Sequence, residues 1–162
     1  NLKRFSRTDD QSVKDKLNLS AVAKEAISLT LPKMKTHLIH FSEDIQKDMI
    51  VKGNSIELEQ VIINLINNAI DATQHLNEKW IRLSIQEIEN NIVLLVEDSG
   101  EGISESVQGK MFEPFYTTKD INKGTGLGLS VIKGILDDHG ASISVDNQHT
   151  NTCFHVKFPK WQ

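Results

Sequence analysis

Two asparagines four residues apart, Asn64 and Asn68, lie in the segment 55–76, where apolar residues otherwise recur at helical spacing. Side chains four residues apart project from the same face of a helix, so the two amide oxygens could face one cation or one phosphate group. The rest of this polar stripe consists of Glu57, Gln60, Asn67 and Asp71. A solvated helix face is the alternative interpretation, but such faces usually mix both charges, and residues 57–74 contain no lysine or arginine.

A second candidate group is the sequence D-x-G-x-G, formed by Asp98, Gly100 and Gly102 just after the apolar run at 92–96. A carboxylate at the end of a buried strand can accept a hydrogen bond from an exocyclic amine, and glycines let the backbone pass close to a flat ring. A simple turn is the alternative, because aspartate and glycine are both favoured in turns. A calcium loop does not fit, since the two glycines occupy positions that need side-chain oxygens.

A third candidate is the glycine-rich segment 123–130, K-G-T-G-L-G-L-S, which precedes another helical pattern. Backbone N–H groups of such a segment, together with a helix N-terminus, make an anion site. Leu127 and Leu129 alternate with the glycines and would pack, which disfavours a flexible linker. The P-loop motif is absent, and G-x-G-x-x-G fails because Leu129 and Val131 stand where its third glycine would be.

The residues between these two glycine segments include Phe112, Phe115, Lys119 and Lys123. Taken singly, the aromatic residues are typical of core packing and the lysines of solvated surface. Next to a phosphate-binding segment, however, either lysine could pair with a triphosphate as a point charge.

These groups must be positioned by elements that the patterning predicts along the chain. Helices are expected from Ser20, the N-cap, with Pro32 ending or kinking the helix, at 55–76 and at 128–138. Strands are expected at 37–41, 49–51, 80–88, 92–96, 142–145 and 153–158, with Asn90 and Asn91 turning a hairpin between the third and the fourth. We therefore expect an α+β fold, a two-layer sandwich whose mixed, mostly antiparallel sheet is covered by a layer of helices.

Composition limits the function classes. The 162 residues carry a net charge of −4, which argues against general affinity for nucleic acid or anionic membrane surfaces. The longest apolar run spans five residues, 92–96, whereas a membrane-spanning helix needs about 20. No apolar signal segment opens the chain, and the single cysteine, Cys153, excludes an intrachain disulfide. A cytoplasmic location is the expectation.

Taken in order, these motifs resemble the N, G1, F and G2 boxes of bacterial sensor histidine kinases. The matching residues are Asn64-x-x-x-Asn68, Asp98-x-Gly100-x-Gly102, the sequence F-E-P-F at 112–115, and Gly124-x-Gly126-x-Gly128. Residues 151–159 look like the closing strand of the same catalytic ATP-binding domain. The domain belongs to the wider superfamily that includes gyrase, Hsp90 and MutL, and the resemblance covers about residues 18–160.

The resemblance implies an ATP and Mg²⁺ site. Asp98 would hold the adenine amine beside Gly102 and Thr152, Asn68 would bind Mg²⁺ with support from Asn64, and residues 126–128 would meet the phosphates under a mobile lid at about 109–125. The expected ATP-binding residues are Asn64, Asn68, Asp71, Asp98, Gly100, Gly102, Ile103, Phe115, Lys119, Lys123, Gly124, Gly126, Leu127, Gly128, Leu129 and Thr152.

The resemblance also implies what the chain lacks. None of the six histidines has the sequence context of the phosphoacceptor, so the γ-phosphoryl group would pass to a histidine on a separate dimerisation domain, and from there to a response regulator. Residues 1–17 look like a remnant of the dimerisation helix and a linker. Asn64 stands where gyrase-like ATPases have the glutamate that activates water, so intrinsic ATPase activity should be negligible. The alternatives are an anti-sigma-type serine kinase and a non-catalytic nucleotide-binding or docking module.

Overall fold

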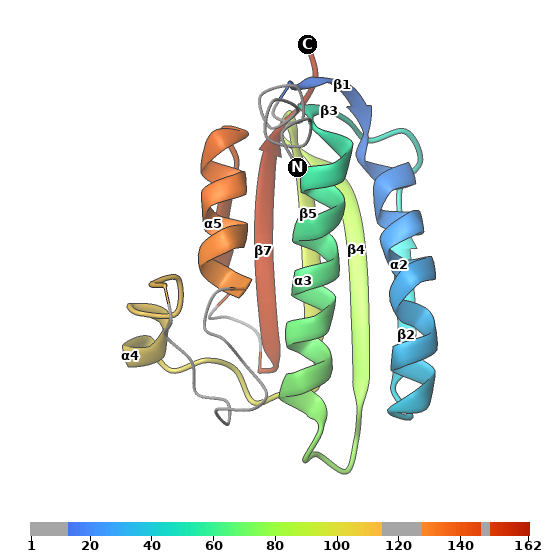
Figure 1. The fold of residues 1–162 in the computed structure, drawn as a ribbon, viewed down its shortest axis with the longest axis vertical. Helices are drawn as coiled ribbons and strands as arrows, with labels where there is room; N and C mark the ends of the chain where they lie inside the picture. The colour runs from blue at the N-terminus through green and yellow to red at the C-terminus, as the bar shows by residue number, and fades with distance from the viewer. Residues whose placement is uncertain (1–12, 115–127, 147–149) are drawn as a thin grey trace, which may run out of the picture.

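Three helices lie side by side on one face of a five-stranded sheet (Figure 1). The structure, a computed structural model, describes residues 13–114, 128–146 and 150–162. The covering helices are α2 (Leu19–Thr36), α3 (Ser55–Thr73) and α5 (Gly128–Asp138), and α4 (Glu105–Gln108) is a single short turn. The predicted α+β sandwich of two layers is confirmed.

The sheet is mixed, as predicted, and its strand order is β2-β4-β5-β7-β6. β2 (His40–Ile45) runs parallel to β4 (Trp80–Ile88). The other neighbours pair antiparallel, namely β4 with β5 (Asn91–Asp98), β5 with β7 (Thr152–Pro159) and β7 with β6 (Ser142–Val145). A separate antiparallel pair is formed by β1 (Asp15–Asn18) and β3 (Ile50–Gly53).

The predicted hairpin joins β4 and β5, but its turn begins one residue earlier than expected. Ile88 pairs with Asn91, so Glu89 and Asn90 form the two-residue loop. Both have positive φ, 51° and 66°, which matches a type I′ turn, the geometry whose twist suits a two-residue hairpin. Asn91 is already the first residue of the strand.

Helix α2 departs from the prediction at its N-terminus and extends beyond Pro32. Asn18, not Ser20, is its N-cap and accepts a hydrogen bond from the Ala21 N–H. The helix passes through Pro32 and ends at Thr36. Proline removes one backbone donor, and because Pro32 lies on the solvent-exposed side of the helix, water can reach the carbonyl that loses its partner.

Two strands also differ from the prediction: one begins later than expected, and one was not expected at all. The strand expected at 37–41 begins only at His40, because Leu38 has a φ of 59° and so belongs to the helix terminus. β1 lies in a segment that the sequence analysis assigned to a linker, and its backbone pairs with β3. Short strands of this kind carry too little apolar alternation to be found from one sequence.

The core lies between the sheet and the helices. Alternate residues of the central strands face the helices and are almost fully buried: Ile81, Leu83, Ile85, Ile92, Leu94, Val96, Phe154, Val156 and Phe158. The apolar stripe of α3 packs on them with Leu58, Ile62, Leu65, Ile66 and Ala69. The polar stripe of α3 is therefore directed away from the sheet.

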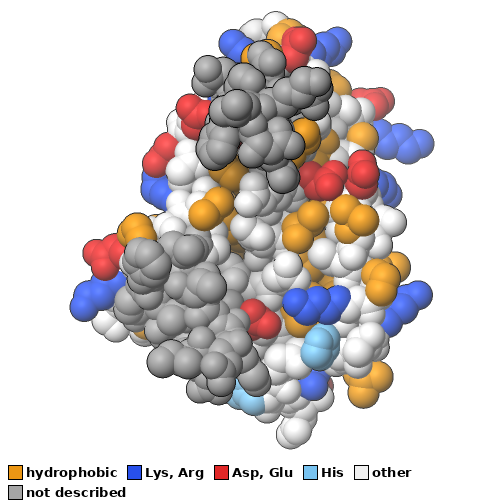
Figure 2. Space-filling view, viewed as in Figure 1, with side chains coloured by type: hydrophobic (Ala, Val, Ile, Leu, Met, Phe, Trp, Pro, Cys, Tyr) orange, Lys and Arg blue, Asp and Glu red, His pale blue; other side chains and the backbone are white. Residues whose placement is uncertain are grey.

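Chain direction brings the described parts of several predicted motifs to one end of the molecule. β5 ends, β7 begins, α5 begins and α3 ends at the same side, the lower edge in Figure 1. On the helix-covered face, acidic and basic side chains are interspersed and do not gather into one basic patch outside the grey regions (Figure 2). No helix within the described ranges combines the length and apolar character needed to cross a bilayer.

Removing a core contact of α3 should destabilise the whole domain. Leu65 has no solvent exposure, so Leu65→Ala is expected to lower the free energy of unfolding by about 2–5 kcal/mol, measured by urea denaturation. The matched control is Leu29→Ala on α2, where the side chain is 58% exposed and the loss should stay below about 1 kcal/mol. Equal losses in the two variants would contradict this assignment of the core.

Candidate functional site

Asp98 is a buried acid at the last position of β5. It pairs with Ile81 of β4 on one side and with Thr152 of β7 on the other, and only 2% of the residue is exposed. Its Oδ1 accepts a hydrogen bond from the Gly100 N–H at 2.7 Å. The strand pattern therefore carries an ionisable group to the end of the sheet and keeps it out of bulk water.

Burial dominates the chemistry of this carboxyl group. It raises the pKa of Asp98 to about 6, while the hydrogen bonds from the Gly100 N–H and the Thr152 hydroxyl act in the opposite direction. At neutral pH the group is therefore a charged acceptor with little hydration. A ligand that donates a hydrogen bond, such as an exocyclic amino group, would restore part of the solvation that burial removes.

Gly100 lies so close to this acid that no side chain fits. A Cβ on Gly100 would stand 2.7 Å from Asp98 Oδ1 and 2.9 Å from Thr152 Oγ1, well inside van der Waals contact. The glycine requirement that the sequence analysis attached to D-x-G-x-G is thus steric at this position. The Gly100 N–H donating to Asp98 two residues earlier is also the hydrogen bond of an Asx turn, so this geometry fits a turn and a ligand site alike.

Thr152 of β7 is hydrogen-bonded to both glycines, Gly100 and Gly102, that follow β5. Its hydroxyl oxygen accepts a hydrogen bond from the Gly102 N–H at 3.1 Å, and its own N–H donates to the Gly100 carbonyl, also at 3.1 Å. Gly102 has a φ of 92°, in the region that favours glycine. Asp98, Gly100 and Gly102 of the D-x-G-x-G motif therefore form one hydrogen-bonded group with Thr152.

The helical side of the site is formed by α3 and the start of α5, which pack together. Asn64, Asn68 and Asp71 are all partly buried on α3. A Cβ on Gly128, the first residue of α5, would lie 4.0 Å from Asn68 Oδ1. The structure thus brings the predicted metal-binding amide against the start of the glycine-preceded helix.

The remaining predicted residues divide into two sets. Leu129 and Ile103 are partly buried and pack on the core, and the Ile103 carbonyl accepts a hydrogen bond from Gln108 Nε2 at 2.7 Å. The residues that lie outside the described ranges are Phe115, Lys119, Lys123, Gly124, Gly126 and Leu127.

Two residues that the sequence analysis did not select also hold the glycine segment. Asn151 Nδ2 donates to the carbonyl of Gly100 at 3.2 Å and lies 3.4 Å from the carbonyl of Ser99. Ser99 Oγ in turn accepts a hydrogen bond from the Trp80 N–H at 3.2 Å. No motif of the sequence pointed to either residue, because both side chains contact backbone groups.

Cys153 follows Thr152 in β7 and has no solvent exposure. Burial, reinforced by the negative charges of Glu97, Asp146 and Asp98, raises the pKa of its thiol to about 12. The thiolate that would act as nucleophile or metal ligand is therefore not populated at neutral pH, and Cys153 contributes packing to the site and no reactivity.

The arrangement can bind a ligand with two chemically different ends. The sheet side offers a buried acceptor beside glycine backbone, which suits a flat ring bearing an amino group. The helix side offers neutral amide oxygens and a helix N-terminus, which suit phosphate groups and a hard cation. Neutral amides add no negative charge next to a polyphosphate, which favours such a ligand electrostatically.

Comparison with known proteins finds a family and relatives that match most of this chain. Residues 53–162 match the family described as Histidine kinase-, DNA gyrase B-, and HSP90-like ATPase. Sporulation kinase A of Bacillus subtilis is 35% identical over 158 residues, which cover 96% of this chain and 25% of the relative. The chain thus spans about a quarter of the length of that protein.

Solved structures agree with the sequence comparison. The catalytic domain of the histidine kinase ThkA superimposes with a TM-score of 0.81 at 32% identity, covering 91% of this chain and 95% of that one. ThkA in complex with the response regulator protein TrrA superimposes with a TM-score of 0.77 at 29% identity, covering 91% of this chain and 42% of the other.

The order of the motifs, the fold that brings Asp98, Gly100 and Thr152 together, and these similarities lead to one conclusion. The chain belongs to the family of histidine kinase-, DNA gyrase B- and HSP90-like ATPases, as the ATP-binding catalytic domain of a sensor histidine kinase.

Proposed function

We propose that this domain binds ATP with Mg²⁺ and donates the γ-phosphoryl group to a histidine on a separate dimerisation domain. The observation that carries the proposal is the buried Asp98 carboxylate, which accepts hydrogen bonds from the Gly100 N–H and from Thr152. It lies at the same end of the molecule as Asn68 and the start of α5, which are close to each other (Figure 1). A response regulator would receive the phosphoryl group next, as the ThkA–TrrA complex suggests by analogy.

Adenine recognition is assigned to the sheet side. The Asp98 carboxylate would accept a hydrogen bond from the adenine amino group, and the ring would lie against the backbone at Gly100 and Gly102, where side chains are absent. Support comes from the buried acceptor at Asp98 and from the positive φ of Gly102, which keeps a side chain off the backbone there. Thr152 would hold the acid and the glycine segment in register, with Ile103 on the apolar side.

Phosphate and metal binding are assigned to the helix side. Asn68 would supply one oxygen ligand to Mg²⁺ and Asn64 would support it, while backbone N–H groups from Gly124 to Leu129 would face the phosphates, with Lys119 and Lys123 as counter-charges and Asp71 beside the metal site. The fit rests on Asn68 Oδ1 lying against Gly128. When bound, Mg²⁺ neutralises phosphate charge, and it keeps several waters, so few protein ligands are required.

The chain holds no complete catalytic set for phosphoryl transfer. Such reactions depend mainly on positioning and charge neutralisation, and the acceptor histidine with its base would be supplied by the other domain. Asn64 cannot take a proton from water, because an amide is not a base at neutral pH. The domain would therefore protect bound ATP from hydrolysis until the acceptor is in place.

The proposal is tested by separating binding from transfer. The chain alone should bind ATP in calorimetry, take up no acid-labile phosphate from labelled ATP, and hydrolyse ATP at background rate. Addition of a dimerisation domain from the same kinase should give phosphohistidine on that domain. Phosphorylation of a serine substrate instead would favour an anti-sigma-type kinase, and failure to bind ATP would favour a docking module.

Asp98→Asn should change stability and ATP binding in opposite directions. The folded-state pKa of about 6 lies above the ordinary 3.8, so the free energy of unfolding falls as pH rises from about 4 to 6. Removing the charge should raise the melting temperature of the ligand-free domain at pH 7.5 and abolish most of this pH dependence. The affinity for ATP should fall about tenfold or more, because a charge-assisted hydrogen bond is lost.

Thermal melts at pH 5 and 7.5, together with calorimetry, measure both effects of Asp98→Asn. The amide oxygen of asparagine can still accept the Gly100 N–H, so the local turn should persist. A variant that is less stable at pH 7.5 and also binds ATP weakly would instead make Asp98 a structural residue.

Asn68→Ala should remove the Mg²⁺ dependence of ATP binding. The affinity measured with Mg²⁺ is expected to fall to the value measured in EDTA, because the metal loses its protein ligand, whereas the metal-free affinity should change little. Asn67→Ala is the matched control, since the Asn67 side chain faces α2 and accepts a hydrogen bond from Lys33 Nζ at 3.2 Å. The same loss with and without metal would show that the role of Asn68 is wrongly assigned.

A further inference from the structure

The α3–α5 pair is held at the end opposite to the site by a polar contact between their termini. Asn54, the N-cap of α3, donates its backbone N–H to His139 Nε2 at 3.1 Å, and His139 directly follows α5. The Asn54 side chain accepts the Glu57 N–H at 3.1 Å as the helix cap. His139 is buried, with 8% exposure, so this hydrogen bond is shielded from water.

The hydrogen bonds define the state of the His139 ring. A backbone N–H can only donate, so Nε2 is the unprotonated nitrogen. Nδ1 lies 2.8 Å from the Ile135 carbonyl oxygen, which can only accept, so Nδ1 carries the proton. The ring therefore links the last turn of α5 to the first turn of α3 as a neutral imidazole with both nitrogens in use.

Residues just before β1 also bind to this pair of helix termini. Asn54 Nδ2 donates to the Val13 carbonyl at 3.2 Å, and Lys14 Nζ lies 2.8 Å from Asp138 Oδ2 at the end of α5. The Lys14 ammonium holds the pKa of Asp138 below its usual value. Three segments far apart in the sequence, the approach to β1, the start of α3 and the end of α5, thus meet in one hydrogen-bonded junction.

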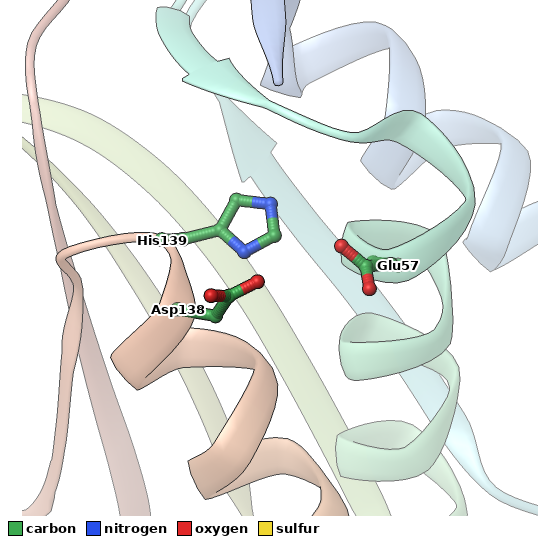
Figure 3. Close-up of side chains that lie close together, drawn as sticks. All are labelled: Glu57, Asp138 and His139. Atoms are coloured by element: carbon green, nitrogen blue, oxygen red, sulfur yellow. The ribbon is translucent and has the colours of Figure 1, made fainter. Parts of the chain in front are cut away.

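A metal ion is the other occupant that this cluster suggests. Ligand atoms of Glu57, Asp138 and His139 lie within 4.8 Å of one another (Figure 3). Both ring nitrogens of His139 already have backbone partners, and Asp138 is paired with Lys14. Among the buried side-chain atoms of this cluster, Glu57 Oε1 is left without a hydrogen-bond partner, and one carboxylate oxygen does not make a metal site. The cluster is therefore a structural junction.

The junction matters more for the position of α5 than for the position of α3, because α5 buries fewer residues. Eight residues of α3 are buried, but only Ile132 and Leu136 are buried in α5. Leu129 and Ile135 add partly buried apolar contacts, and the polar contacts at the C-terminal end of α5 supplement this smaller apolar surface. The opposite end of α5 begins at Gly128, against Asn68.

We propose that His139 and Asn54 are positioning residues for the phosphate end of the nucleotide site, and that the contacts of Val13 and Lys14 connect the preceding strand to it. This inference rests on the proposed function. Because the junction sets the spacing of α3 and α5, it should affect the groups that hold phosphate and metal. Asp98, Gly100 and Thr152 are held by the sheet, so adenine binding should not depend on it.

The test compares two ligands on two substitutions at one residue. His139→Leu removes both ring nitrogens and leaves the buried Asn54 N–H without its acceptor, whereas the side-chain oxygen of His139→Gln can replace Nε2. For folded His139→Leu, the affinity for ATP with Mg²⁺ should fall about fivefold or more, and that for adenosine should stay within about twofold. His139→Gln should restore most of the ATP affinity. Equal weakening of both ligands, or unchanged ATP binding, would overturn the proposal.

Lys133→Gln is the matched control. Lys133 makes an ion pair with Asp137 within α5, close to the junction, but this pair joins no second element. Its substitution should leave both affinities unchanged. A loss of ATP affinity equal to that of His139→Leu would show that any change near the end of α5 has this effect, and would overturn the specific role of His139.

The unmutated chain provides a measurement that does not depend on folding of a variant. If the junction and phosphate binding are coupled, ATP with Mg²⁺ must stabilise the junction in return. Amide exchange of Asn54, followed by NMR, should slow more with saturating ATP and Mg²⁺ than with saturating adenosine. Equal exchange in the two complexes would overturn the inference alone, whereas absence of ATP binding in the titration would overturn the proposed function and the inference with it.

Discussion

A charged carboxylate almost without solvent contact is the constraint around which this domain is organised. Asp98 is carried to the end of the sheet by β5, and the backbone N–H of Gly100 and the hydroxyl of Thr152 compensate only part of its lost hydration. β7 must therefore supply a hydroxyl opposite Asp98, which is that of Thr152. The residue two positions after Asp98 must have no side chain, and it is Gly100. The unfavourable charge is what prepares the site for a ligand that donates a hydrogen bond.

The two ends of the candidate site have different supports. The end proposed for adenine is part of the sheet, in which β5 is hydrogen-bonded on both sides. The end proposed for phosphate lies between α3 and α5, which contact each other through side chains and at their termini. Because sheet hydrogen bonds resist relative movement more than a contact between two helices does, we expect the proposed phosphate end to adjust more readily.

Much of this fold could be predicted because its central elements have strong periodicity. The bounds of β4, β6 and α5 agree with the prediction, since alternation or helical spacing is sustained and breakers lie on both sides. The N-cap of α2 was wrong, since Asn18 and not Ser20 accepts the first free N–H, and of the two outcomes expected at Pro32 the helix does not end there. β1 was missed, because pairing with β3, a tertiary contact, decides its conformation.

Part of the candidate site could be proposed from the sequence because its residues recur in short motifs. Glycine and aspartate at fixed spacing indicated the acid and its neighbours, and Asn68 was recognised as a misfit on a helix face. The contact of Asn151 with the glycine segment and the junction at His139 could not be derived, because each joins positions more than 50 residues apart through a backbone group. Backbone donors and acceptors are the same in every residue, so sequence patterns do not reveal their partners.

The buried Cys153 has a practical consequence for spectroscopy. With no exposed surface and a thiol that stays protonated, it should resist maleimide and nitroxide reagents under native conditions. A cysteine placed on the outer face of α5 or α2 would then be the single labelled position, and the native thiol in β7 would not have to be replaced. Helix movements in the intact chain thus become measurable with one engineered residue per probe.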